Sequence, residues 1–135
     1  MKFITRYTDY ALRSLLFLAS QASKESGKCF KVDEVAKELN LPRAQMRRIF
    51  QTLAKEEILK SCKGRSGGFE LNVNPKDVSM VDIIKIFQGP IDLSNCFLQK
   101  DICPNKPKCA IRAKLEKVSK IVEQELNSLR LDCDC

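Results

Sequence analysis

The strongest constraint on the fold is a pair of short amphipathic helix patterns separated by a tight turn. In each pattern the apolar residues fall at i, i+3, i+4 and i+7, the spacing of one helical face: Val32, Val35, Ala36 and Leu39, then Met46, Ile49, Phe50 and Leu53. The first helix is expected to stop at Asn40-Leu41-Pro42, and proline suits the start of the second, because its missing N–H is not needed there. The pattern predicts a helix-turn-helix, although a plain pair of packed helices has the same periodicity.

A basic, glycine-rich hairpin is predicted directly after this pair. A short strand begins at Ile58, residues 62–68 form a turn, and residues 69–73 alternate apolar and polar side chains as a second strand does. Three of the five glycines lie in the turn, next to the basic side chains of Lys60, Lys63 and Arg65. Because glycine lets a backbone approach a sugar–phosphate edge, the segment predicts a DNA-binding wing. A plain hairpin loop is the alternative.

The distribution of charge indicates a polyanionic partner. The net charge is +7 over 135 residues, and residues 42–65 alone hold seven Lys/Arg against two Asp/Glu. Double-stranded DNA is therefore the expected partner. An anionic membrane is the weaker alternative, because no segment is long and apolar enough to span or anchor. Asp9 and Arg13 interrupt any export-signal core, so we expect a cytoplasmic protein.

Helices are predicted on both sides of this unit. Residues 9–20 are apolar around most of the circumference and should be largely buried, and residues 21–29 form a polar connector. A shorter helix at 78–88 ends at Gly89-Pro90. Residues 110–131 form one long helix with a seam of positions seven apart: Ile111, Val118 and Glu125, with Leu115, Val122 and Leu129. Since the chain offers no partner of comparable length, this helix is expected to pair with its twin in a homodimer. Packing across its own domain is the alternative.

Three cysteines lie in one loop between these last two helices. Six residues separate Cys96 from Cys103, and five separate Cys103 from Cys109. Thiolates are soft ligands that hold iron–sulfur clusters or zinc, but both usually need a fourth ligand. The chain has no histidine. This absence excludes His-ligated zinc, imidazole acid–base catalysis and a Cys-His dyad within the chain, so we do not expect an enzyme.

The other four cysteines are interpreted separately. Seven cysteines is an odd number, and a reducing compartment argues against a disulfide scaffold. Cys29 and Cys62 are therefore expected to be separate, part-buried thiols. Cys133 and Cys135 are interpreted as a frayed tail, with a fourth metal ligand or an exchanging thiol as alternatives.

Four segments together resemble the Rrf-type winged helix-turn-helix family of bacterial regulators, which includes IscR-like and NsrR-like iron–sulfur regulators. They are Thr8-Asp9-Tyr10-Ala11-Leu12-Arg13, the turn at Leu41-Pro42, Lys63-Gly64-Arg65-Ser66-Gly67-Gly68-Phe69 and the three-cysteine loop. The resemblance covers essentially the whole chain. It implies a mainly α fold with a small β-hairpin wing. Residues 1–77 would form the DNA-binding domain, and residues 78–135 the cluster-binding loop and dimerisation helix.

The resemblance also implies a cofactor and its ligands. It carries over Cys96, Cys103 and Cys109 as ligands of an iron–sulfur cluster, beside the dimer interface. The IscR-like branch completes a [2Fe-2S] site with a histidine, but Arg112 stands three residues after Cys109 here. The NsrR-like branch completes a [4Fe-4S] site with an aspartate of the partner subunit, and Asp9 matches that position. A [4Fe-4S] cluster is thus favoured over [2Fe-2S]. Asp9 as a plain residue stabilised by the helix dipole remains the alternative.

DNA binding is assigned to the second helix of the pair and to the wing. The exposed face at the start of that helix is expected in a major groove: Arg43, Ala44, Gln45, Arg47 and Arg48. Arg47 suits guanine and Gln45 suits adenine, and Lys63 and Arg65 suit phosphate or the minor groove. A two-fold dimer implies a pseudo-palindromic operator.

Two other functions remain open at this point. In the first, the protein is a cluster-free thiol-redox regulator in which Cys103, Cys109 or the tail cysteines form reversible disulfides. In the second, weaker one, the cysteine loop holds a structural zinc. The expected function is a dimeric DNA-binding regulator that senses redox, nitric oxide or iron–sulfur status through a cluster.

Overall fold

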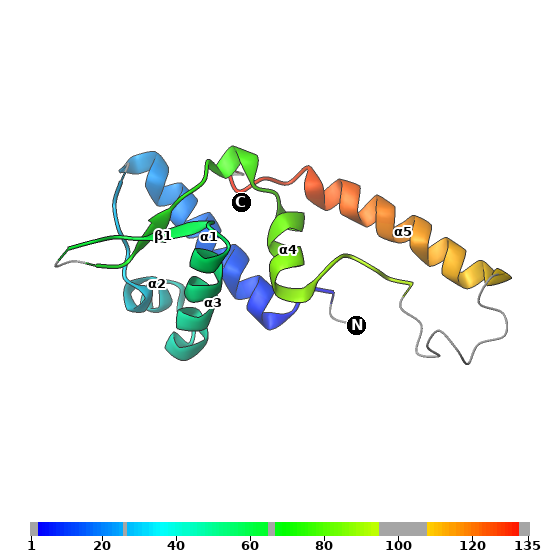
Figure 1. The fold of residues 1–135 in the computed structure, drawn as a ribbon, viewed down its shortest axis with the longest axis horizontal. Helices are drawn as coiled ribbons and strands as arrows, with labels where there is room; N and C mark the ends of the chain where they lie inside the picture. Colours follow the sequence, from blue (N-terminus) through cyan, green and yellow to red (C-terminus); the bar gives the residue numbers. More distant parts are fainter. Residues whose placement is uncertain (1–2, 26, 65–66, 95–107, 133–135) are drawn as a thin grey trace.

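The computed structural model describes residues 3–25, 27–64, 67–94 and 108–132. Within these residues the chain is mainly α-helical, as predicted, with one small hairpin (Figure 1). The elements are, in order, α1 (Arg6–Lys24), α2 (Val32–Leu39), α3 (Arg43–Lys55), β1 (Leu59–Ser61), β2 (Phe69–Leu71), the 3₁₀ turn η1 (Pro75–Asp77), α4 (Met80–Gln88) and α5 (Ala110–Asn127).

Helix α1 is longer at both ends than the predicted 9–20. It begins after Thr5, whose side-chain oxygen accepts a 3.3 Å hydrogen bond from the Thr8 N–H, which is an ordinary N-terminal cap. One face packs into the core through Ala11, Leu15 and Leu18, and the opposite face is exposed. Hydroxyl-rich ends such as these carry no hydrophobic periodicity, so the pattern alone could not extend the helix.

Helices α2 and α3 form the predicted helix-turn-helix. Helix α2 ends at Asn40, which adopts the left-handed conformation (φ 55°), and α3 starts directly after Pro42. The apolar stripe of α3 is fully buried, with Met46, Ile49, Phe50 and Leu53 each at 0% exposure. Burial of each such side chain contributes about 1.5–3 kcal/mol. This stripe anchors α3 to the body of the protein and turns its polar face outward.

The wing is an antiparallel hairpin in which Leu59 pairs with Leu71 and Ser61 with Phe69. Both strands are shorter than predicted. A further bridge joins β2 to the connector between α1 and α2: Phe30 N–H donates to the Phe69 carbonyl (2.9 Å), and Phe69 N–H donates to the Phe30 carbonyl (2.7 Å). The connector therefore acts as a short third strand and holds the wing against the helix-turn-helix.

The chain after α5 returns to the core and pairs with the segment before α4. Helix α4 starts with a capping box between Ser79 and Asp82 and ends at Gly89, as predicted. After α5 the chain turns and pairs with the segment before α4: Met80 N–H donates to the Leu129 carbonyl (2.9 Å), and Leu131 N–H to the Val78 carbonyl (3.1 Å). This pairing ends α5 earlier than the predicted residue 131.

The buried core spans the predicted boundary between residues 77 and 78. Leu131 and Ile83 belong to the same buried cluster as Leu15 and Phe50. From this base α5 projects away from the other helices (Figure 1). The division into two domains stays a prediction, and residues from both predicted domains share one core.

Gly68 is the position where the wing depends on glycine. Its φ is +104°, and a Cβ there would lie 2.7 Å from the Phe30 carbonyl carbon. Gly64 has a similar φ of +124°, but a Cβ at that position would have nothing within 4 Å. An alanine at either position would be strained by the positive φ. Only at position 68 would its Cβ also collide with the backbone of Phe30.

We predict that Gly68→Ala lowers the free energy of unfolding by about 3 kcal/mol, and that Gly64→Ala lowers it by about 1 kcal/mol, from strain alone. Thermal and urea unfolding followed by circular dichroism measure both values. Equal losses in the two variants would show that the close approach to Phe30 is unimportant.

Candidate DNA interface and cysteine loop

The exposed face of α3 carries most of the predicted base-contacting residues. Arg43, Ala44, Arg47 and Arg48 are exposed, whereas Gln45 is half-buried. The Oε1 atom of Gln45 is buried and has no hydrogen-bond partner among the described residues. Gln45 is therefore less available for adenine than the sequence predicts, and the arginines dominate the accessible surface.

Arg47 is held by an ion pair to the neighbouring helix. Its Nη2 atom lies 3.3 Å from Oδ1 of Asp33 in α2. The two side chains are 60% and 44% exposed, so the pair contributes only about 0–1 kcal/mol. An arginine held this weakly is oriented by Asp33 yet can exchange it for a base edge or phosphate.

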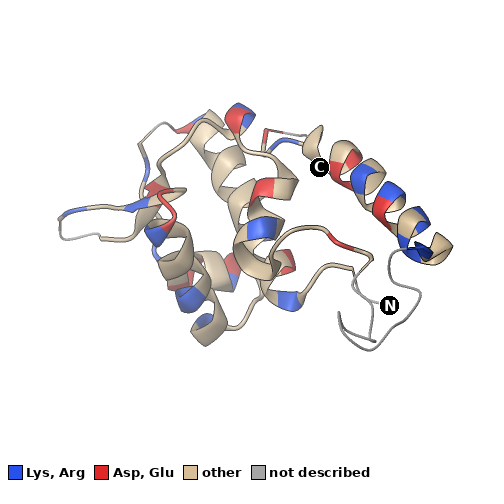
Figure 2. Cartoon of the chain, turned by 45° about the vertical axis from the view of Figure 1, so that its right-hand side comes forward, with Lys and Arg blue, Asp and Glu red and all other residues tan. Residues whose placement is uncertain are grey.

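The wing presents one basic side chain without an ion pair among the described residues, that of Lys63. Lys63 is exposed just beyond β1, whereas Lys60 lies within the strand and pairs with Glu70 at 3.2 Å. Arg65 lies outside the described residues. Positions of basic residues are found along the hairpin toward its outer end (Figure 2). Lys63 thus offers an exposed cation at the wing, whereas the cation of Lys60 is already paired with Glu70.

Of the three loop cysteines, only Cys109 lies within the described residues; Cys96 and Cys103 lie outside them. Cys109 is the N-cap residue of α5, half-buried and with a free thiol. The positive end of the helix dipole stabilises negative charge at this position. A thiolate ligand at residue 109 is therefore compatible with the local structure.

Both ends of the cysteine loop are anchored to α5. Leu93 N–H donates a 2.8 Å hydrogen bond to the Ser119 hydroxyl, which itself donates to the Leu115 carbonyl (2.9 Å). Ser119 is the buried residue of α5. At the loop entrance, hydrogen bonds from the side chain and backbone of Ser94 hold the pKa of Asp92 below its usual value. The loop thus leaves and rejoins the chain beside one helix.

Asp9 lies in the first turn of α1 and on the surface. Its carboxylate pairs with Arg13 one helical turn later (Nε–Oδ2 3.0 Å), and the side chains are 61% exposed for Arg13 and 43% for Asp9. This location fits both interpretations of Asp9, as a residue favoured by the helix dipole and as a group that a partner subunit can reach.

A hydrogen-bond network joins the start of α1 to the end of α4. The Oε1 atom of Gln88 accepts hydrogen bonds from Thr5 N–H (3.0 Å) and from the Thr8 hydroxyl (2.8 Å). Its Nε2 atom donates to the Phe3 carbonyl (2.9 Å). Gln88 precedes the chain that enters the cysteine loop, so the turn that contains Asp9 is fixed to that entrance. Local sequence patterns do not reveal this link, because its partners are 80 or more residues apart.

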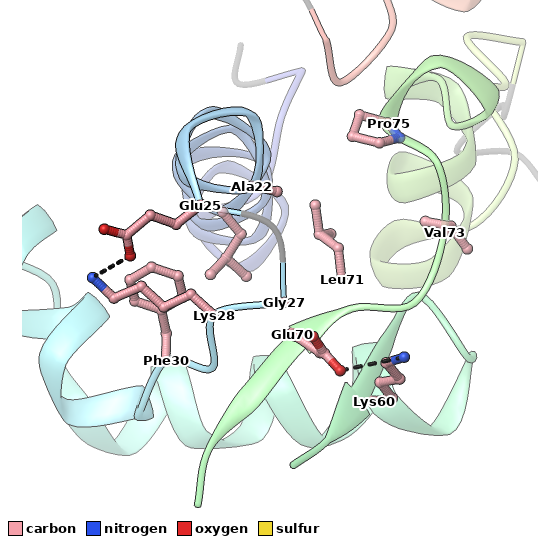
Figure 3. A pocket seen from close by; sticks show the side chains of 11 residues that line it. Ala22, Glu25, Gly27, Lys28, Phe30, Lys60, Glu70, Leu71, Val73 and Pro75 are labelled. Atoms are coloured by element: carbon pink, nitrogen blue, oxygen red, sulfur yellow. Dashed lines mark ion pairs between the residues drawn. The ribbon is translucent and has the colours of Figure 1, made fainter. Parts of the chain in front are cut away.

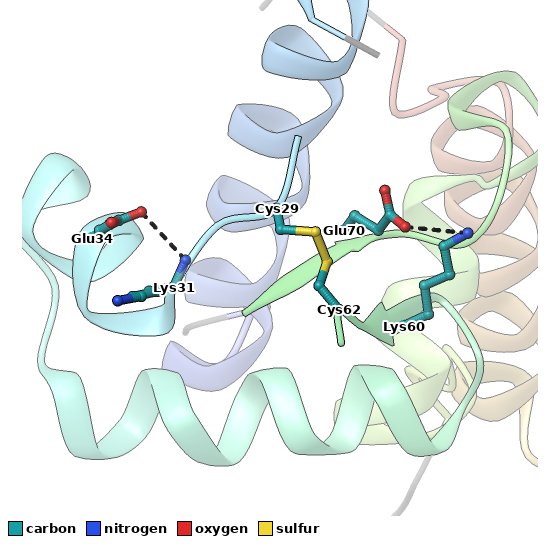
Figure 4. The surroundings of a disulfide bond; sticks show 6 residues. All are labelled: Cys29, Lys31, Glu34, Lys60, Cys62 and Glu70. Atoms are coloured by element: carbon teal, nitrogen blue, oxygen red, sulfur yellow. Dashed lines mark hydrogen bonds and ion pairs between the residues drawn. A yellow bond between two sulfur atoms is a disulfide. The ribbon is translucent and has the colours of Figure 1, made fainter. Parts of the chain in front are cut away.

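Cys29 and Cys62 form a disulfide, so the prediction of two separate thiols was wrong (Figure 4). The backbone bridge between Phe30 and Phe69 brings the connector beside the wing. A hydrogen bond from Cys62 N–H to the Gly68 carbonyl (2.9 Å) fixes the wing side. The Cα atoms are 6.3 Å apart, which suits a disulfide. Both residues are half-buried, as predicted. The pairing was missed because the connector was not recognised as a strand.

A pocket of about 440 Å³ lies where the hairpin joins the core, between the end of α1 and β2 (Figure 3). Its rim carries two ion pairs, Lys28 with Glu25 (3.4 Å) and Lys60 with Glu70 (3.2 Å). Phe30, Leu71 and Val73 contribute apolar wall. The Glu70 carboxylate also lies within 4.8 Å of both disulfide sulfurs, so the pocket and the disulfide are neighbours.

A helix-turn-helix with a basic hairpin and an outward-facing arginine helix defines a winged-helix DNA-binding protein. Residues 4–133 match the Rrf2 family, described as "Iron-dependent Transcriptional regulator". The chain therefore belongs to the Rrf2 family of transcriptional regulators, and the predictions of family, fold and a regulator rather than an enzyme are confirmed.

Three similar proteins illustrate the family. A "Putative HTH-type transcriptional regulator rrf2-like" of Rhodobacter capsulatus is 32% identical over 81% of this chain and 76% of its own. The regulator NsrR of Halalkalibacterium halodurans is 30% identical over 83% of this chain and 75% of its own. The structure of CymR, "the Global Cysteine Regulator of B. subtilis", superposes with a TM-score of 0.75 at 24% identity, over 98% of this chain and 95% of that one.

Across the described residues, none of the helices has the length and apolar character needed to cross a membrane.

We predict that Lys63→Ala weakens binding to DNA duplexes of any sequence and lowers the slope of log affinity against log salt by about 0.9, because one phosphate contact is lost. Arg65→Ala is predicted to act in the same way. Lys60→Ala is the matched control, since Glu70 already pairs with that cation. Fluorescence anisotropy across a salt series measures the slopes. An unchanged slope for both Lys63→Ala and Arg65→Ala would contradict the wing assignment.

We also predict that Gln88→Leu destabilises the protein by about 1–3 kcal/mol, because the partners of Gln88 at the start of α1 lose their hydrogen bonds. Gln51→Leu, an exposed glutamine on α3, is the control and should change stability by less than about 0.5 kcal/mol. Chemical denaturation measures both. Equal effects would show that the network does not join α1 to α4.

Proposed function

We propose that this Rrf2 regulator is a cytoplasmic homodimer whose binding to a pseudo-palindromic operator is controlled by an iron–sulfur cluster. The proposed ligands are Cys96, Cys103 and Cys109 of one subunit and Asp9 of the partner subunit. Residues 1–77 form the proposed DNA-binding domain, and residues 78–135 the proposed sensing and dimerisation part. The observation that carries the proposal is the free thiol of Cys109 at the start of α5, beside an uncovered apolar face.

That apolar face supports the dimer. In α5, Ile111 is 72% exposed, Ile121 50% and Val118 39%. Large apolar side chains so exposed along one helix favour burial against a second helix. Packing within the same subunit involves other positions of α5: Glu123 pairs with Lys85 of α4, and Ser119 binds the Leu93 N–H, while the helix projects away from the other helices (Figure 1).

The donor set fits an iron–sulfur cluster better than other groups. Thiolates are soft ligands, Cys109 is not consumed by the disulfide, and the chain has no histidine for a mixed Cys/His site. The resemblance to the NsrR-like branch, in which three cysteines and an aspartate hold the cluster, favours [4Fe-4S] over [2Fe-2S]. When bound, such a cluster supplies a centre that reacts with nitric oxide or oxygen and is lost on iron depletion. The residues of this chain hold it and transmit its presence.

Two contacts provide a route from the loop to the DNA-binding unit. Lys85 of α4 pairs with Glu123 of α5 at 2.8 Å, and this hydrogen-bonded carboxylate raises the pKa of Lys85. Gln88 then joins the end of α4 to the first turn of α1. A change in the position of the loop or of α5 therefore shifts α1, which packs directly on the helix-turn-helix core. The cluster needs only to favour one of two such arrangements.

The second candidate is a cluster-free thiol-redox regulator. The disulfide between Cys29 and Cys62 favours it, because it shows that two cysteines of this chain lie at bonding distance. Reversible disulfides of Cys103, Cys109 or the tail cysteines would then replace the cluster. In this case the purified protein is colourless and contains reducible disulfides in place of iron and sulfide.

Anaerobic purification tests the proposal. We predict a brown protein with iron and acid-labile sulfide, and an operator affinity that differs between the protein with and without iron. The operator is first obtained by selecting bound duplexes from a random DNA library. Colourless protein without sulfide, or equal affinities of the two forms, would contradict cluster control.

The ligand assignment needs its own variants. Asp9→Ala should lose much of the bound iron, whereas Arg13→Ala removes the same ion pair but keeps the carboxylate, and should retain the iron. Iron and sulfide content per subunit measures both. If Asp9→Ala retains iron as fully as Arg13→Ala, Asp9 is not a ligand and acts only at the helix terminus.

A further inference from the structure

We propose that Cys29 and Cys62 are a redox-active pair: their disulfide, formed by exchange with a low-molecular-weight disulfide, fixes the outer part of the wing and strengthens DNA binding. This site is separate from the cysteine loop and would respond to the thiol–disulfide balance of the cell. It adds a second input and does not depend on a cluster.

The location of the pair links it to the DNA-binding surface. Cys62 immediately precedes Lys63, the wing lysine that lies exposed beyond β1. Cys29 immediately precedes Phe30, whose backbone is paired with Phe69 of β2. The disulfide therefore ties the last residue before the wing tip to a connector that is already fixed to the core (Figure 4).

The backbone holds the two cysteines together whether or not they are bonded. The Phe30–Phe69 hydrogen bonds and the bond from Cys62 N–H to the Gly68 carbonyl fix both segments. With the Cα atoms 6.3 Å apart, oxidation and reduction need no rearrangement of the chain. Such a pair is suited to reversible chemistry, because the folded protein accepts both states.

The pair is also accessible to a small molecule. Both cysteines are half-buried rather than enclosed. The 440 Å³ pocket reaches their surroundings through Gly27 and Lys28, next to Cys29, and through Glu70, which lies within 4.8 Å of both sulfurs (Figure 3). In the cytoplasm, the proposed location of this regulator, stable disulfides are rare, and those that form are usually transient and redox-sensing.

The chemistry balances as two successive exchanges. The thiolate of one cysteine attacks a small disulfide RSSR, forms a mixed disulfide and releases one RS⁻. The thiolate of the second cysteine attacks the protein sulfur of that mixed disulfide, forms the Cys29–Cys62 bond and releases the second RS⁻. The two protein thiols are oxidised by two electrons, RSSR is reduced to two RSH, and the two thiol protons pass to the released thiolates. Excess RSH reverses both steps.

The expected effect on DNA binding is moderate. The hydrogen bonds at the base of the hairpin persist after reduction, so only the residues beyond Cys62, beginning with Lys63, gain freedom. Ordering one or two such residues on binding weakens affinity by about three- to tenfold. The oxidised protein therefore binds more tightly, and the difference is largest at low salt, where the contact of Lys63 with phosphate is strongest.

The first test counts thiols in the full-length protein. The protein is equilibrated anaerobically in buffers of varied reduced-to-oxidised glutathione ratio, alkylated, digested and analysed by mass spectrometry at residues 29 and 62. We expect both residues to change together from alkylated to disulfide-bonded as the ratio falls. A pair that stays oxidised at every ratio, or stays reduced at every ratio, would overturn the proposal. This readout involves neither DNA nor a cluster, so it stands apart from the outcome for the cysteine loop.

The second test compares wild type with the double variant Cys29→Ser/Cys62→Ser. Anisotropy with the selected operator duplex is measured in oxidising and reducing glutathione buffers. We expect reduction of the Cys29–Cys62 disulfide to lower the operator affinity of wild type by about three- to tenfold. The double variant should not show this loss. Any response of the cysteine loop remains in both proteins and cancels in the comparison. Identical responses would refute control of the wing by this pair.

Two further readouts separate the remaining explanations. Circular dichroism of the double variant should match that of reduced wild type, since serine preserves the size of cysteine. If the double variant is unfolded, the single variant Cys62→Ser, which also cannot form this disulfide, takes its place in the comparison. Zinc is also measured, because Cys29, Cys62 and Glu70 lie close enough to bind one ion. One zinc per subunit in reduced wild type, absent from the double variant, would replace the redox pair with a metal site.

Discussion

The close approach of Gly68 to Phe30 is the contact on which the rest of the DNA-binding part depends. Two backbone hydrogen bonds, of 2.9 and 2.7 Å, join Phe30 to Phe69 only because the neighbouring residue has no side chain. They turn a polar connector into a strand and hold the wing at a fixed angle to α3. The wing that carries Lys63 is thereby held to the same core as α3, and Cys29 meets Cys62 as a consequence.

A second non-local pairing determines what the C-terminal part can do. Residues 129–131 pair with residues 78–80, which ties the end of α5 to the start of α4 and buries Leu131 in the core. The cysteine loop leaves from the other end of α4. Helix α5 is thus held at its C-terminal end and by the Ser119–Leu93 bond, while its outer apolar residues remain uncovered. This geometry favours a second subunit as their partner.

Local patterns predicted most of the helices and strands, and non-local contacts explain the pairings that these patterns missed. The predictions of the buried stripe from Met46 to Leu53 and of the turn at Pro42 were confirmed, because neighbouring residues determine a helical face and a helix start. The disulfide of Cys29 and the Gln88 network were missed, since their partners lie 33 and 80 or more residues away. The base-reading role of Gln45 also depends on burial, which periodicity does not define.

The electrostatics at the start of α1 reconcile the two interpretations of Asp9. An acidic residue in the first turn is favoured by the helix dipole, by about 0.3–1 kcal/mol at an exposed site. Its ion pair with Arg13 is exposed and contributes no more than about 1 kcal/mol. Exchanging Arg13 for the proposed metal centre of a partner would therefore cost little. Because Gln88 fixes this turn to the entrance of the cysteine loop, a ligand bound here would act on both subunits at once.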